Sequence, residues 1–155
     1  MTQLLVDATA WQTVFFGLCS FPAFLTSGLL RLGGQGRTAH AVARWIYWRW
    51  LAAEPAERFF SSSWRTWAAV AVTLPVFAII AYLLSGIVIN LAYPLRPDVL
   101  PTDWGGPSLA GRWTVHAVGG LVFAMITPLI SIGLRNVSRR VLVGPEQATR
   151  TPRRT

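Results

Sequence analysis

The chain has 155 residues, of which 53% are hydrophobic and 13% are charged. Soluble domains usually carry about 25% charged residues, so this composition argues against an ordinary water-soluble enzyme or binding domain. The net charge of +8 comes from fourteen arginines against six acidic residues, without any lysine, and these arginines flank long apolar runs. This placement is typical of contact with anionic lipid headgroups, and we expect no nucleic acid partner.

The first apolar run, residues 11–30, is long enough for a transmembrane helix, which needs about 20 apolar residues. Pro22 lies inside this run and several glycines follow it. Two alternatives therefore stay open: a helix that crosses the bilayer fully, or a tilted or re-entrant segment with its N-terminus on the cytoplasmic side.

The next segment, residues 39–53, has helical propensity, and Arg37, His40, Arg44 and Trp48 fall on one face of such a helix. Indole rings prefer the headgroup level of a bilayer, which favours a helix lying in the cytoplasmic interface. The alternative is that residues 39–53 are the cytoplasmic end of a longer tilted helix. The predicted lipid-headgroup contacts are Arg37, Arg44, Arg49, Trp45 and Trp48.

The second apolar run, residues 67–92, contains no charged residue and predicts another transmembrane helix. Ser85 and Gly86 are small, so they allow a second helix to approach closely. The following loop, residues 93–112, is rich in proline and glycine. Trp104 in this loop is a candidate contact for a ligand or a partner, or an anchor at the membrane surface.

The third apolar run, residues 113–134, contains Gly119, Gly120 and Gly133, which predict close packing on the preceding span or on a partner subunit. His116 opens this run and could ligate a haem or a pigment, although an interfacial hydrogen bond is the commoner role, and we expect no cofactor. The polar, basic tail, residues 146–155, is predicted to be disordered.

The arginines are distributed unequally: six lie in residues 31–65 and six from residue 135 onward, but only two in residues 93–112. The positive-inside rule then places loop 31–65 and the C-terminus in the cytoplasm, and loop 93–112 outside, in a bacterial inner membrane. We therefore predict an all-α integral membrane protein. It has about three transmembrane helices (11–30, 67–92 and 113–134) and an interfacial cytoplasmic helix (39–53).

Two parts of the chain repeat each other. Trp, Thr, Pro and Phe recur at the same offsets in residues 11–24 and 64–77. The pattern Arg44-x4-Arg49-x-Leu51 is echoed by Arg135-x4-Arg140-x-Leu142. The repeats predict a single membrane domain, residues 1–145, with unequal half-repeats at about 11–55 and 64–145. The first half is too short to hold two full spans.

The second half-repeat carries a series of short motifs. They read Trp64-Arg-Thr-Trp, Leu74-Pro75-Val-Phe, Tyr93-Pro94-Leu, Trp113-Thr-Val-His116 and Arg139-Arg140-Val-Leu-Val-Gly144-Pro145. Over residues 64–145 they resemble the actinobacterial membrane sensor domain family. The resemblance implies two similar helical hairpins, which in that family precede a histidine kinase core or stand alone. Since no kinase core follows residue 155, the resemblance implies the stand-alone form here.

The side chains that catalysis or metal binding would need do not gather in this sequence. None of the six acidic residues lies in a predicted span, and one cysteine with two separated histidines cannot complete a metal site. Residues 33–36 are rich in glycine but lack the Lys-Ser/Thr of a phosphate-binding loop. We therefore expect no enzyme activity, no catalytic residue and no metal.

A chain of this kind is expected to act through contacts. Our leading hypothesis is an accessory or stabilising subunit of a larger inner-membrane complex, for example an energy-converting one. Its partners would be other integral membrane subunits and anionic phospholipids. One alternative is a stand-alone sensor of a lipid or envelope stimulus that relays to a separate kinase. A second alternative is a haem- or pigment-carrying subunit that uses His116.

Overall fold

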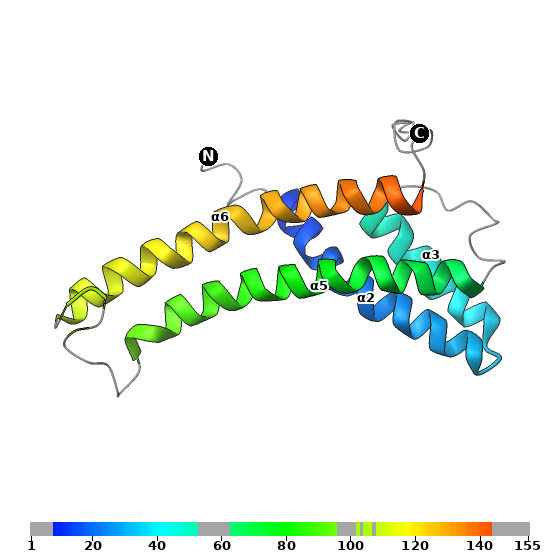
Figure 1. Ribbon diagram of the computed structural model, residues 1–155, viewed down its shortest axis with the longest axis horizontal. Helices are drawn as coiled ribbons and strands as arrows, with labels where there is room; N and C mark the ends of the chain where they lie inside the picture. Colours follow the sequence, from blue (N-terminus) through cyan, green and yellow to red (C-terminus); the bar gives the residue numbers. More distant parts are fainter. Residues whose placement is uncertain (1–7, 53–62, 96–101, 103, 107, 144–155) are drawn as a thin grey trace.

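The computed structural model describes residues 8–52, 63–95, 102, 104–106 and 108–143. These residues form an all-α fold without strands. Two antiparallel hairpins, α2 with α3 and α5 with α6, lie against each other (Figure 1). The elements in chain order are α2 (Ala8–Leu32), α3 (Gly36–Leu51), α5 (Ser63–Ala92), the 3-10 helix η1 (Tyr93–Leu95) and α6 (Leu109–Leu142).

Three segments are long and apolar enough to cross a membrane: α2, α5 together with η1, and α6. Each of the three predicted apolar runs lies inside one of them, so the predicted all-α fold with three helices of spanning length and composition is confirmed. The helices extend past the predicted ends because the arginine-bearing turns are helical too. α6, with 34 residues, is about 51 Å long, which exceeds the hydrocarbon core of about 30 Å.

A glycine turn separates α3 from α2. The N–H of Gln35 donates to the carbonyl of Leu30 (2.8 Å) and the N–H of Gly34 donates to that of Arg31 (3.1 Å). Gly34 has a φ of 77°, which makes this a Schellman motif, a common helix ending. The chain therefore reverses, and the alternative that residues 39–53 continue a longer tilted helix is wrong. α3 has 16 residues, or about 24 Å, too short for a full span.

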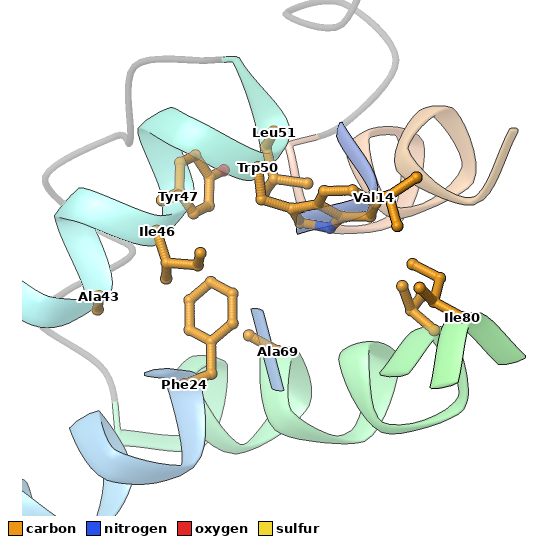
Figure 2. Close-up of a cluster of buried hydrophobic side chains, with 10 residues drawn as sticks. Val14, Phe24, Ala43, Ile46, Tyr47, Trp50, Leu51, Ala69 and Ile80 are labelled. Carbon is orange, nitrogen blue, oxygen red and sulfur yellow. The ribbon is translucent and has the colours of Figure 1, made fainter. Parts of the chain in front are cut away.

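The four helices meet in a buried cluster around Trp50. Figure 2 shows this indole reaching from α3 toward Val14 of α2, with Ile80 of α5 opposite. Gly17 makes room for it, since a Cβ there would lie 3.0 Å from the indole and 2.5 Å from Ile80. Phe24 belongs to the same cluster and is fully buried. The cluster fixes α3 across the hairpins, and we call this region the four-helix end.

Small hydroxyl residues line the contact between the hairpins. The buried positions of α5 recur at alternating three- and four-residue spacing, and both Thr66 and Thr73 belong to them. In the sequence repeat these two residues correspond to Thr13 and Ser20 of α2, which are buried as well. Residues of this size let helix backbones approach closely at a shallow crossing angle. The corresponding residues of the two repeats are therefore buried in both hairpins.

The other half of the α5–α6 hairpin stands alone. The buried residues of α5 end at Leu83, and those of α6 begin at Gly120. In Figure 1, α2 and α3 lie beside one half of the hairpin, and α5 and α6 continue past them without further helices. We call this part, residues 84–95 and 109–119, the two-helix arm. Its outer surfaces are apolar and uncovered by any described residue.

Candidate functional site

Three of the glycines predicted for helix packing lie between α5 and α6. A Cβ on Gly86 would lie 2.7 Å from the ring of Phe123, and one on Gly119 would lie 2.5 Å from the Oδ1 of Asn90. Gly120 is buried, and a Cβ there would lie 3.6 Å from the Cβ of Asn90, an ordinary contact distance. Gly86 and Gly119 therefore leave no room for a larger side chain unless the neighbouring side chain or helix moves, whereas Gly120 does.

The other two predicted packing residues face away from the hairpin. The hydroxyl of Ser85 is exposed and donates to the carbonyl of Tyr82 in its own helix (2.7 Å). Gly133 has no atom within 4 Å of the position that a Cβ would occupy. Neither residue joins two described helices, so only their predicted role toward a partner stays open.

Ser85 belongs to a stripe of exposed residues on α5. The stripe, which we call the α5 stripe, repeats at alternating four- and three-residue spacing on the face opposite the buried seam. Tyr82 is its largest member and is 70% exposed. Along the stripe, a small residue recurs every seven residues of the chain. Its members are Ala71, Pro75, Ala78, Tyr82, Ser85, Ile89 and Ala92.

A cavity of about 270 Å³ lies at the tip of the two-helix arm. The Nδ1 of His116 lies 3.4 Å from the Oδ1 of Asn90, and the imidazole stacks on Tyr93 with the ring centroids 4.1 Å apart. Asn90 is held in turn by its Nδ2, which donates to the carbonyl of Gly86 (2.7 Å). The lining residues are Asn90, Tyr93, Trp104, Val115, His116 and Gly119.

The contact of His116 with Asn90 depends on the tautomer of the imidazole. The amide nitrogen of Asn90 donates to Gly86, so its oxygen faces the ring, and the contact is a hydrogen bond in the tautomer that carries its proton on Nδ1. The Nε2 atom is buried and has no hydrogen-bond partner among the described residues. It is therefore a buried polar atom that no described residue satisfies. The predicted role of His116 toward a cofactor stays a prediction, and spacing along the chain could not identify Asn90 as its neighbour.

Trp104 stands at the rim of this cavity with 81% of its surface exposed. Gly105 and Gly106 follow it with φ angles of 99° and 73°, a region that strongly favours glycine. Ser108 then caps α6 by accepting a hydrogen bond from the N–H of Gly111 (3.0 Å). The two glycines and the cap fix the start of α6 and so hold the indole beside the cavity.

The residues predicted to contact lipid headgroups share the exposed face of α3. Arg37, Arg44 and Arg49 are exposed, and Trp45 and Trp48 are 47% and 55% exposed. The guanidinium of Arg49 lies over the rings of Trp48 and Phe16, at 4.8 and 5.5 Å. The opposite face of α3 carries Trp50 into the core. The predicted face is therefore present, while lipid contact itself stays a prediction.

Charge is one-sided throughout the described part of the chain. All six acidic residues lie outside it, whereas nine of the fourteen arginines lie within it. The described residues contain no group of three or more His, Cys, Asp or Glu side chains that could hold a metal ion.

Comparisons with protein-family models, with curated proteins and with solved structures find no match to this chain.

Proposed function

We propose that this protein is a non-catalytic subunit of a larger inner-membrane complex, which it joins by packing the α5 stripe on a helix of another integral membrane protein. The observation that carries this proposal is the placement of Tyr82. Its phenol is 70% exposed within the charge-free run 67–92 of α5, and its hydroxyl makes no hydrogen bond to any described residue.

A phenol hydroxyl facing lipid without a partner is unfavourable, since burying an unpaired hydroxyl costs roughly 1–3 kcal/mol in proteins. A partner helix with a polar side chain at this depth would remove that penalty, and interhelical hydrogen bonds in membranes contribute about 1 kcal/mol. Tyr82 therefore favours a protein neighbour over lipid on this face.

The rest of the stripe has the shape that a helix partner needs. Ala71, Ala78, Ser85 and Ala92 are small and stand one heptad apart on the same exposed face. Small residues at this spacing let a second helix approach closely with a shallow left-handed crossing. The α5 stripe repeats, on the outer face, the pattern of small residues that the inner face uses between the hairpins.

Photo-crosslinking tests this proposal directly. A benzoylphenylalanine at position 82 should yield a specific crosslinked protein in native membranes, and the same probe at Val88 serves as the control. Val88 is 64% exposed on the same helix but lies beside the stripe. Tyr82→Phe and Ala78→Phe should weaken co-purification of that protein in mild detergent about tenfold. Crosslinking to lipid alone, or equally from both positions, would refute the proposal, and a crosslink only to a second copy would show self-association instead.

A second candidate function rests on the cavity at the tip of the arm. The lining of this cavity by His116, Asn90 and Trp104 favours binding of a small ligand or a haem-type cofactor, as a sensor or a cofactor carrier would require. A visible spectrum of the purified protein, or ligand-dependent changes in Trp104 fluorescence, should be lost in His116→Ala. A colourless protein whose Trp104 fluorescence responds to no envelope ligand would remove this candidate.

A further inference from the structure

A second hollow, at the junction of α2, α3 and α6, carries two arginines. It is a cavity of about 290 Å³ with Arg49 and Arg135 in its wall, contributed by α3 and α6. The remaining lining residues are Thr9, Gln12, Thr13, Phe16, Trp48 and Ala52. We propose that this cavity binds the phosphate of an anionic phospholipid, a proposal that does not depend on any protein partner.

Both charged side chains among the described lining residues are cations. The Nε of Arg135 is buried without a hydrogen-bond partner among the described residues. The described residues contain no acidic side chain, so no carboxylate among them neutralises Arg49 or Arg135. Arginine binds phosphate through the planar fork of its guanidinium, and such charge-assisted hydrogen bonds are among the strong ones. A phosphate in this cavity would accept hydrogen bonds from the guanidinium groups that line it.

Arg49 is already held in place for this role. Its guanidinium stacks on the rings of Trp48 and Phe16, and cation–π contacts of this kind leave the N–H groups in the ring plane free to donate. Gln12 and Thr13 add polar groups to the same wall. The site therefore combines a fixed cation, a second cation with an unused donor, and neutral hydrogen-bonding groups.

An apolar hollow adjoins the charged one and favours a lipid over a free phosphate ion. This neighbouring cavity of about 510 Å³ shares Gln12, Phe16 and Arg49 with the first and adds Trp11, Phe15 and Ala8. Phe15 is 58% exposed along it. A headgroup phosphate on the arginines would leave an acyl chain against these aromatic rings, so the two hollows match the two ends of one phospholipid.

Native mass spectrometry of the full chain in mild detergent tests the site. The delipidated protein is titrated with dioleoyl phosphatidylglycerol, with dioleoyl phosphatidylcholine and with inorganic phosphate. We expect one tightly held phosphatidylglycerol, at least tenfold weaker binding of the zwitterionic lipid, and a tenfold loss of phosphatidylglycerol affinity in Arg135→Gln. The matched control is Arg140→Gln, an exposed arginine of the same helix outside the cavity, which should bind like the unaltered protein.

Further variants separate the possible results. Phe15→Ser should weaken phosphatidylglycerol binding several-fold through the acyl chain, and Arg135→Lys should restore only part of the binding lost in Arg135→Gln, because lysine keeps the charge without the fork. Thermal unfolding confirms that each variant is folded. Equal binding by Arg135→Gln and Arg140→Gln, or equal binding of both lipids, would overturn the proposal. Full displacement by millimolar inorganic phosphate together with an unaffected Phe15→Ser would also overturn it in favour of a free-phosphate site.

Discussion

Replacing Gly119 by alanine tests the packing of the two-helix arm. A Cβ at this position would lie 2.5 Å from the Oδ1 of Asn90, closer than any real contact, so either Asn90 or the helix must move. Asn90 connects Gly86 of α5 to the ring of His116. The substitution therefore disturbs both the packing of α5 on α6 and the lining of the cavity.

The magnitude follows from two opposing effects. Alanine is favoured over glycine inside a helix by about 1 kcal/mol. Overpacking a close contact costs roughly 1–3 kcal/mol. Gly119→Ala should therefore lower the free energy of unfolding by up to about 2 kcal/mol, on the sum of these effects. Gly133→Ala is the matched control, since nothing lies within 4 Å of its Cβ position, and it should raise stability by up to about 1 kcal/mol.

Equilibrium unfolding in mixed micelles of dodecyl maltoside and sodium dodecyl sulfate, followed by tryptophan fluorescence, gives both values. The decisive quantity is the difference between the two alanine variants, expected at about 1–3 kcal/mol. Two variants equal within about 0.5 kcal/mol would refute the reasoning, because additivity errors are of that size. The close approach of α5 and α6 at Gly119 would then be absent.

Further predictions concern the core, the topology and one phenol. Trp50→Ala should lower the free energy of unfolding by about 3–5 kcal/mol, whereas exposed Trp45→Ala should change it little, as unfolding in mixed micelles will report. In a cysteine-free background, Trp104→Cys should react with an impermeant maleimide in intact cells and Ser63→Cys only after permeabilisation; the reverse pattern would invert the orientation. Burial raises the pKa of Tyr47 to about 12 against the opposing charge of Arg65, so stability should fall as pH rises from about 10 to 12, and Tyr47→Phe should reduce that fall.

The long helices could be predicted from the sequence because their signal is local. Residues 67–92 contain no charge, and Arg112 and Arg135 bracket the third run at a spacing that fits a bilayer. The reversal of the chain after α2 was harder to predict, since it depends on a Schellman ending at Gly34. The cluster of glycines at residues 33–36 was its only trace in the sequence.

The candidate sites depend on which residues of distant helices meet, which periodicity along one helix does not define. Gly119 and Gly133 look alike in the sequence, yet only Gly119 faces α5. Arg49 was recognised from the face of its own helix. Its neighbour Arg135 could not be, because the two helices that carry them are brought together by tertiary packing around Trp50.

The hydroxyl seam between the hairpins has a consequence for assembly in the bilayer. Thr13, Ser20 and Thr73 each donate to a carbonyl of their own helix, so drawing the hairpins apart would leave none of these hydroxyls unsatisfied in lipid. Because no water is released from hydrocarbon when helices associate, shape and packing must supply the affinity at this seam. The fit of the small side chains, rather than interhelical hydrogen bonds, therefore holds the two hairpins together at these three positions.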